Sequence, residues 1–109
     1  MSYFFPTSDE CTHRTIFDSL HTTTMAGEHI QFSLVDIPPG GVVPSHSHPN
    51  EQLGLMISGA LEFTIAEETK IVRAGDMYRI PGGVVHSCRA LTEPVRVLDA
   101  FYPVRDEYR

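Results

Sequence analysis

The stretch PGGVVPSHSHPNEQLGLMISG, residues 39–59, is the part of this sequence that decides the fold. It places His46 and His48 one residue apart. Because side chains alternate between the two faces of an extended strand, this spacing turns both imidazole rings to the same face. Neutral imidazole nitrogens are frequent metal ligands, so two of them on one face indicate a site for a divalent cation. The pair alone is more typical of two solvated histidines in a loop, and its surroundings decide between the two interpretations.

Two more side chains extend the pair along the chain. Gln52 stands four residues after His48, and His86 follows a turn-forming run of proline and glycine at residues 81–83. Three imidazole nitrogens and an amide oxygen would leave room for a substrate on the cation. We therefore expect one divalent metal ion, of zinc, nickel, iron, manganese or cobalt, on four ligands: His46, His48, Gln52 and His86.

Glycines and a proline stand at fixed distances from these ligands. The first group has the pattern G-x5-H-x-H-x3-Q-x6-G and runs from Gly40 to Gly59. The second has the pattern G-x5-P-x-G-x2-H and runs from Gly75 to His86, after an interval of fifteen residues. Both resemble the two sequence motifs of the cupins, with Gln52 in the place of the usual glutamate. The resemblance implies an antiparallel β-barrel of the RmlC-like jelly-roll type.

The rest of the chain predicts the same all-β class. Apolar and polar residues alternate, and proline and glycine pairs interrupt the alternation at short intervals. We expect one domain, with an N-terminal arm of edge strands over residues 1–30, a cupin barrel over 31–105 and a tail over 106–109. In the arm, 14–17 and 22–26 are candidate edge strands, and 8–12 is a short helix or a loop. The barrel strands are expected at residues 31–37, 42–46, 52–57, 61–65, 70–72, 77–80, 84–89 and 95–102.

Composition limits the partners of this domain. Apolar residues make up 41% of the chain and charged residues 20%, which is ordinary for a globular protein with a core. Fourteen acidic residues outweigh eight basic ones and give a formal net charge of -6. Nucleic acid is therefore not an expected partner, because phosphate binding needs a basic face. A small anionic substrate would have to be held by a local arginine.

The two cysteines and the apolar segments indicate a location. Cys11 and Cys88 are too few for a disulfide framework, so a reducing compartment is expected. No apolar run approaches the length of a membrane span, and the first residues do not resemble an export signal. We expect a cytoplasmic protein without a membrane partner.

The amide at position 52 bears on the chemistry of the site. Unlike a carboxylate, the oxygen of Gln52 cancels none of the positive charge of the ion, and such an ion suits Lewis-acid work on an anionic substrate. Glu51 is the alternative ligand at this place. Strand alternation puts the two neighbours on opposite faces, and the motif spacing favours Gln52.

A more specific resemblance covers residues 32–105. The strings HSHPNEQ (46–52), FTI (63–65), AGDMYRIPGGVVH (74–86) and DAFYPVR (99–105) resemble the KdgF-type pectin-degradation cupins. The resemblance implies a metal-dependent isomerase or tautomerase. It would convert 4,5-unsaturated uronate monosaccharides from pectin or alginate into the linear keto form. It also implies that Asp99 and Arg105 are catalytic, and that Phe101 and Arg105 contact the substrate.

The residues themselves allow these roles and leave alternatives open. By alternation, Asp99 lies on an otherwise apolar face of the last expected strand, where a carboxyl group could act as general acid and base. It could equally form an ion pair with Arg96 or Arg105. Arg105 could curl over the barrel mouth and grip a substrate carboxylate with two hydrogen bonds, or remain a solvated arginine of the tail.

Other functions and an oligomeric state complete the expectations. A metal-dependent dioxygenase, a non-catalytic sugar-binding cupin and a barrel with a vestigial site are the alternatives. Cupins commonly pair through their sheets, so the resemblance also implies a homodimer. Cys88 should share the face of His86 as a packing residue. His13, His21 and His29 lack partner spacing and are expected on the surface or in loops.

Overall fold

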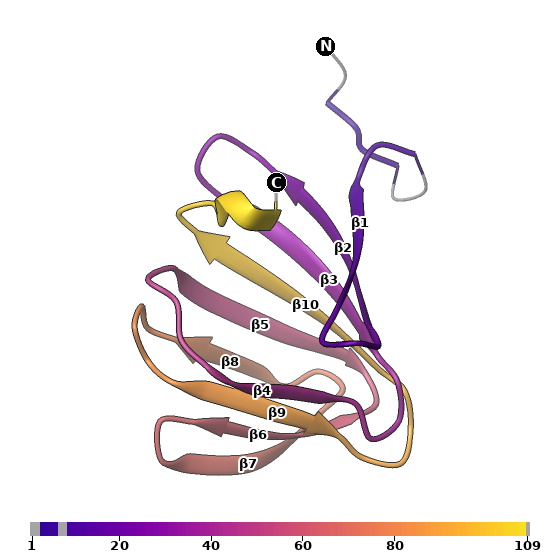
Figure 1. The fold of residues 1–109 in the computed structure, drawn as a ribbon, viewed down its shortest axis with the longest axis vertical. Coiled ribbons are helices and arrows are strands. Elements are labelled where there is room, and N and C mark those ends of the chain that lie inside the picture. The colour runs from indigo at the N-terminus through magenta and orange to yellow at the C-terminus, as the bar shows by residue number, and fades with distance from the viewer. Residues whose placement is uncertain (1–2, 7–8, 109) are drawn as a thin grey trace.

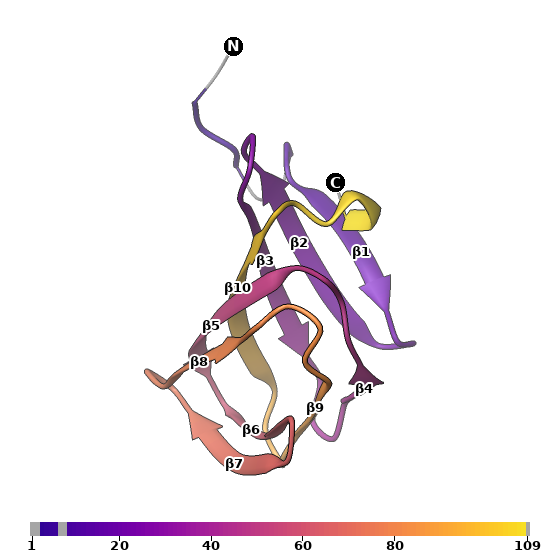
Figure 2. The ribbon, with the colours of Figure 1, turned by 90° about the vertical axis from the view of Figure 1, so that its left-hand side faces the viewer.

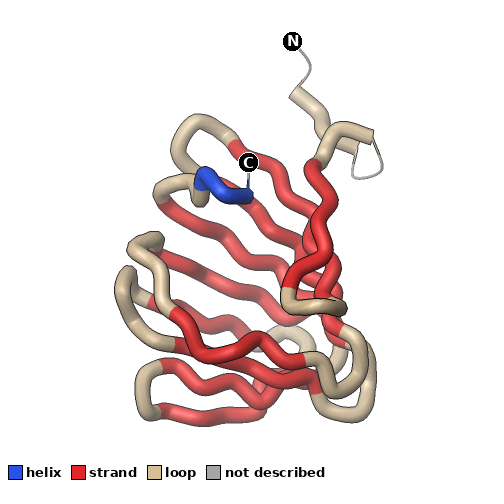
Figure 3. Tube along the Cα trace, viewed as in Figure 1, coloured by secondary structure: helices blue, strands red, loops and turns tan. Residues whose placement is uncertain are grey.

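The computed structural model describes residues 3–6 and 9–108, and these residues form ten β-strands and one short 3-10 helix (Figures 1 and 3). The described residues contain no α-helix, and none of them forms a helix long and apolar enough to cross a membrane. The elements are β1 (Thr12–Ile16), β2 (Leu20–Ala26), β3 (Gln31–Ile37), β4 (Val42–His46), β5 (Glu51–Ser58), β6 (Ala60–Ile65), β7 (Glu68–Arg73), β8 (Met77–Ile80), β9 (His86–Ala90), β10 (Val95–Tyr102) and η1 (Asp106–Tyr108).

The strands form two antiparallel sheets that curl around one interior (Figure 2). One sheet has six strands in the order β1-β2-β3-β10-β5-β8, and the other has four in the order β4-β9-β6-β7. Strands that are distant in the sequence lie side by side, since the last strand, β10, pairs with both β3 and β5. The all-β barrel expected from the sequence is confirmed.

Alternation decides which side chains enter the barrel. Along β10 the residues from Val95 to Tyr102 are buried and less buried in turn, so one side of the strand faces the core. β3 shows the same pattern. Apolar side chains from both sheets therefore meet inside the barrel, where they are buried. The buried core consists of Leu20, Val35, Ile37, Met56, Leu61, Phe63, Ile80, Cys88, Ala90, Val95 and Val97.

The strand expected at residues 84–89 begins later than the sequence pattern indicates. β9 starts at His86, because Val84 and Val85 lie in the connection between the turn at Gly82 and Gly83 and the strand. Gly83 has a φ of 83°, a left-handed conformation that glycine adopts without strain, and its N–H donates to the carbonyl of His48. This turn brings the start of β9 next to the segment that follows β4.

The N-terminal segment is more closely built into the barrel than an arm of edge strands. β2 lies between β1 and β3, so the expectation of an edge strand holds for β1 and is wrong for β2. The turn between β1 and β2 carries Phe17 and Asp18 at φ values of 48° and 71°. Part of the predicted helix or loop at residues 8–12 lies outside the described residues; Asp9 and Glu10 form a turn, and Thr12 already belongs to β1.

The segment after β10 is tied to the mouth of the barrel. The side-chain amide of Asn50 donates to the carbonyl of Pro103 at 2.7 Å. The backbone N–H of Arg105 donates to Oε1 of Gln31 at 3.2 Å, and the amide nitrogen of Gln31 donates to the carbonyl of Arg105. These contacts hold the chain so that the Arg105 side chain starts at the barrel opening.

Candidate metal centre and cavity

A cavity of about 320 Å³ opens between the two sheets. Apolar side chains of the core line one part of the cavity, and polar side chains line the part that contains the histidines. Strands of both sheets contribute polar side chains to it. Residues expected to be functional that line the cavity are His46, Gln52, His86, Asp99, Phe101 and Arg105.

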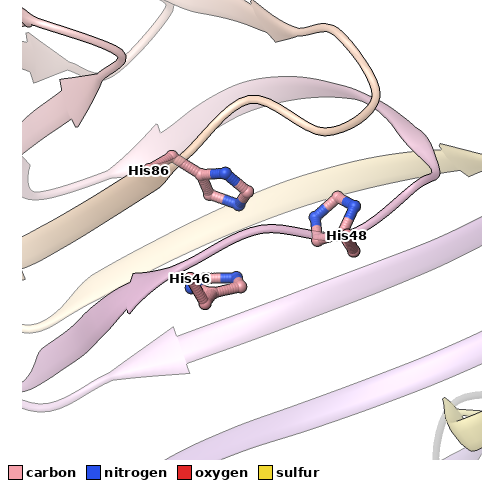
Figure 4. A group of neighbouring side chains, drawn as sticks. All are labelled: His46, His48 and His86. Atoms are coloured by element: carbon pink, nitrogen blue, oxygen red, sulfur yellow. The ribbon is translucent and has the colours of Figure 1, made fainter.

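Three histidines converge at this mouth, as Figure 4 shows. His46 ends β4, His86 begins β9, and the two residues are paired across these strands. His48 comes from the segment after β4. One potential ligand atom from each ring lies within 4.8 Å of the others, so the three side chains can hold a metal ion. His48 and His86 are buried, whereas His46 is half-buried.

The backbone orients all three imidazole rings in the same manner. In each ring Nδ1 lies next to the carbonyl of a residue two positions away, and because a carbonyl can only accept, Nδ1 carries the hydrogen. The other nitrogen, Nε2, is then left with its lone pair, which is the form that binds a metal. The three pairs are His46 with Pro44 at 2.8 Å, His48 with Asn50 at 3.0 Å and His86 with Val84 at 2.9 Å.

Gln52 presents an oxygen to the same centre. Its Oε1 lies 3.0 Å from Nε2 of His48, whereas its amide group hydrogen-bonds to Asp99. Gln52 is 5% exposed and Glu51 is exposed, so the alternative ligand points away from the cavity. His48 thus has an oxygen beside each ring nitrogen although a neutral imidazole has a single N–H. A cation between Nε2 and the amide oxygen would resolve this conflict, and the donor set fits a divalent metal.

Burial favours the uncharged form of His48 and His86. It lowers the pKa of His86 to about 4, and it also lowers the pKa of His48, where the nearby charge of Arg105 acts in the same direction. At neutral pH both rings are therefore in the form that donates a lone pair to a metal.

Asp99 faces the cavity from the middle of β10. Burial raises the pKa of its carboxyl group to about 6, while hydrogen bonds from Tyr78 and Gln52 act in the opposite direction. The phenol of Tyr78 donates to Oδ1 of Asp99. The alternative of an ion pair with Arg96 is wrong, since Arg96 pairs with Asp36 at 2.8 Å on the outside of the sheet. A buried carboxyl group with a pKa near neutrality can both accept and return a proton.

Phe101 and Arg105 close the cavity on the side of β10. Phe101 is 5% exposed, and its ring meets that of His48 edge to face at 5.6 Å between centroids. The guanidinium carbon of Arg105 lies 5.3 Å from the centroid of the Phe101 ring, and Nη2 is 3.0 Å from Glu107. With a side chain 13% exposed, Arg105 is not a solvated arginine of the tail.

Some side chains at the cavity were not expected from the sequence. Tyr78 reaches Asp99, and alternation in β8 could have placed it inward, although nothing in the sequence tells which partner it meets. Phe17 lines the cavity from the hairpin between β1 and β2, with its ring 6.3 Å from that of His46. The hairpin carries no motif that could have indicated this contact.

Cys88 and the three histidines outside the cluster lie where the sequence indicates. Cys88 lines the cavity below His86, and burial raises the pKa of its thiol to about 12, so that it remains protonated as a packing residue. His13, His21 and His29 are exposed. His13 and His21 face each other across β1 and β2, with Nδ1 of the first 3.1 Å from Nε2 of the second.

An antiparallel barrel with a histidine cluster at its mouth defines the class of cupin-like proteins. A family model of the cupin domain matches residues 33–101, which is more than half of the chain and includes the three histidines, Gln52 and Asp99. The chain therefore belongs to the cupin family.

Solved structures agree with this assignment. An RmlC-like cupin from Shewanella frigidimarina has a TM-score of 0.88 at 19% identity, covering 99% of this chain and 97% of that one. KdgF from a Halomonas species has a TM-score of 0.87 at 24% identity, covering 98% of each chain. Oxalate decarboxylase from Bacillus subtilis, a protein with Mn(II) centres, has a TM-score of 0.81 at 24% identity, covering 91% of this chain and 29% of that one. At these identities the likeness shows a shared fold.

The germin-like relatives are longer proteins than this chain. Germin-like protein 9-3 from rice (Oryza sativa subsp. japonica) is 30% identical over 82 residues, which are 69% of this chain and 38% of that protein. The chain spans between 26% and 38% of the length of the germin-like proteins that it matches most strongly.

Proposed function

We propose that this cupin is a metal-dependent isomerase that converts 4,5-unsaturated uronate monosaccharides into their linear keto form. The observation that carries the proposal is that Asp99, Arg105 and two members of the three-histidine cluster, His46 and His86, line one cavity. A buried carboxyl group, an arginine that can pair with a substrate carboxylate and a metal site together suit an anionic sugar. The structural likeness to KdgF and the matching strings in the sequence support the same substrate class.

The metal would be held by the Nε2 atoms of His46, His48 and His86 and by the amide oxygen of Gln52. The ion, when bound, supplies a Lewis acid for the negative charge that develops on oxygen during the reaction. The amide ligand leaves the full positive charge of the ion available, and the substrate carboxylate supplies the compensating charge.

Arg105 and Phe101 form the binding part of the site. The guanidinium of Arg105 is held over the Phe101 ring and paired on one side with Glu107, which fixes its direction toward the cavity. It can donate two parallel hydrogen bonds to a substrate carboxylate. The Phe101 ring offers a flat apolar wall against which the sugar ring can lie.

Asp99 performs the proton transfers. Its carboxylate takes the proton of the hemiacetal hydroxyl group; the carbonyl forms there, the bond to the ring oxygen breaks, and the former ring oxygen becomes an enolate. The protonated Asp99 then returns the proton to the carbon at the far end of the enolate, which yields the ketone. No proton or electron is gained or lost overall. The pKa of Asp99 at about 6 suits both directions of transfer.

The test is turnover of unsaturated galacturonate and mannuronate monomers by the metal-loaded protein, followed as loss of the ultraviolet absorbance of the conjugated double bond. Asp99→Asn should lower kcat at least about a thousandfold while one metal ion per chain remains bound, since an amide cannot accept the proton. Asp36→Asn, which changes an aspartate on the outer face, is the matched control and should turn over normally.

Two results would contradict the proposal. Retained turnover in Asp99→Asn would remove Asp99 from its role. A metal-loaded wild-type protein that leaves both sugars unchanged but consumes oxygen with a catechol, thiol or diketone would favour the dioxygenase alternative instead.

A further inference from the structure

Asp99, Gly54 and Tyr78 form one row across three neighbouring strands. Asp99 in β10 is the register partner of Gly54 in β5, and Gly54 is the register partner of Tyr78 in β8. On a sheet, residues in one such row turn their side chains to the same face. Asp99 and Tyr78 are therefore two strands apart, with only the backbone of Gly54 between them.

The missing side chain at position 54 makes the contact between the outer two residues possible. A Cβ atom at Gly54 would overlap the Tyr78 ring at Cζ, Cε1 and the phenolic oxygen. The Tyr78 ring thus occupies the space beside Gly54 where a side chain would lie, and its phenol donates to Oδ1 of Asp99. Phe63 packs against the same ring at 4.5 Å between centroids and holds it down from the side of the opposite sheet.

We propose that Tyr78 is a positioning residue for Asp99, and that the absence of a side chain at Gly54 allows the Tyr78 phenol to reach the carboxyl group. This inference rests on the proposed function. The carboxyl group of Asp99 has two donors, the phenol of Tyr78 and the amide of Gln52. Two donors from different strands fix the plane of the carboxylate. Its remaining lone pairs are then directed into the cavity, toward the hydroxyl group from which a proton must be taken.

A positioning role differs from simple satisfaction of a buried polar group. If the phenol only supplied a hydrogen bond for the fold, its removal would lower stability and leave turnover of the folded protein unchanged. If it aims the carboxylate, its removal lowers kcat in a protein that still binds the substrate. Arg105 and Phe101, which would bind the sugar, do not depend on the row of Asp99, Gly54 and Tyr78.

The first test is Tyr78→Phe, which removes one oxygen atom and keeps the ring on Gly54. We expect kcat to fall about ten- to hundredfold, the range of a lost hydrogen bond to a charged group, with KM changed less than about threefold and one metal ion still bound per chain. Tyr102→Phe is the matched control, because Tyr102 is 56% exposed on the outside of β10, and it should keep the wild-type kcat.

The second test is Gly54→Ala, which keeps the phenol and displaces it. It should lower kcat as Tyr78→Phe does, and the double variant should be no slower than the slower single variant, since both changes remove the same contact. Gly27→Ala is the matched control: its Cβ would meet only the carbonyl of Ile30 at 3.5 Å, an ordinary contact. If Gly54→Ala does not fold, Tyr78→Phe carries the test alone.

Wild-type kcat in Tyr78→Phe would overturn the inference, and so would kcat losses that multiply in the double variant. A ¹³C label on the aspartate carboxyl groups separates this failure from that of the proposed function. The Asp99 signal should move in Tyr78→Phe and stay in Tyr102→Phe, whether or not the uronates are turned over. A wild-type protein without turnover would end the proposed function and the catalytic purpose of the contact together, and an unmoved signal would show that the contact itself is absent.

Discussion

At position 52 an amide performs two tasks that a carboxylate cannot combine. Its oxygen lies beside Nε2 of His48, and its amide group donates a hydrogen bond to the buried Asp99. A glutamate would supply an oxygen to the metal but would place a second negative charge against Asp99. Gln52 therefore connects the histidine cluster to the buried carboxyl group of Asp99.

Gln52→Glu should keep the metal and lose activity. The new carboxylate binds a divalent ion at least as well as the amide does, whereas Asp99 loses a donor worth about 1.5–3 kcal/mol. We expect one ion per chain and a kcat lowered about tenfold or more, measured on the unsaturated uronates. Glu51→Gln, an exposed change at the neighbouring position, serves as the control. A Gln52→Glu variant as fast as the wild type would refute this role of the amide.

The stability of the metal-free protein should depend on pH through the buried titratable side chains at the cavity. Burial lowers the pKa of His86 from 6.5 to about 4 and also lowers that of His48, so the unfolded chain binds more protons between these values. Acidification through this window therefore destabilises the fold. Asp99 opposes the effect, because its pKa is raised from 3.8 to about 6 and the folded chain takes up its proton first.

Replacing Asp99 should remove its opposing contribution, so that acidification lowers the free energy of unfolding by the full amount due to His48 and His86. Metal-free Asp99→Asn is expected to lose more unfolding free energy than the wild type between about pH 7 and about pH 5, since the opposing group is gone. Urea unfolding at the two pH values measures the difference. A loss equal to or smaller than that of the wild type would contradict the assigned pKa directions.

Single residues differ in how far the sequence reveals them. The histidines and Gln52 could be found because their spacing is fixed by strand alternation and turns, which are local rules. The inward direction of Asp99 follows from the same alternation. The contact between Tyr78 and Asp99 could not be found, because it depends on which strands are neighbours and on the missing side chain at Gly54.

At the scale of the element, alternation and breakers predicted most strands within one or two residues. The bounds of β3, β4, β8 and β10 agree with the expected ranges. The prediction failed where apolar residues lie in an irregular connection, as Val84 and Val85 do before β9. The sequence predicts an arm where the structure has the β1–β2 hairpin, because pairing of β2 with β3 depends on tertiary contacts that leave little trace in local sequence.

The short strand β8 carries Tyr78 and should depend on one buried side chain. Ile80 is 0% exposed and lies opposite Gln52 in the register. Ile80→Ala should lower the free energy of unfolding by about 2–5 kcal/mol because a cavity remains in the core. Ile71→Ala in β7 is the same substitution at a side chain 39% exposed and should cost less than about 1 kcal/mol. Equal losses in thermal or urea unfolding would show that β8 is not held in this way.

For the whole molecule, the outer face of the six-stranded sheet is more apolar than a solvated face needs to be. Leu34, Leu98, Leu55 and Met77 follow one another in register across β3, β10, β5 and β8. Exposed apolar side chains on the same sheet are Phe32, Leu53, Leu55, Ile57, Met77 and Tyr102. A two-fold axis on this face would place the same row of side chains against itself, which is how identical subunits pair.

The homodimer implied by the family resemblance stays a prediction, and we expect this face to form it. The double variant Leu55→Lys, Leu98→Lys should be a folded monomer where the wild type sediments as a dimer, since four buried charges would oppose the pairing. Ile71→Lys, on the four-stranded sheet, should leave the dimer intact. A wild-type protein that sediments as a monomer at micromolar concentration would contradict the expectation.

Metal content is the most direct test of the account, because the proposed chemistry depends on one cation held by three imidazoles and an amide oxygen. Protein purified without an affinity tag, equilibrated with a divalent ion and freed of excess, should contain about one ion per chain by elemental analysis. His86→Ala should contain almost none, whereas His21→Ala, which removes an exposed histidine of β2, should match the wild type. An ion that stays in His86→Ala, or a wild-type protein that takes up none, would contradict the central claim.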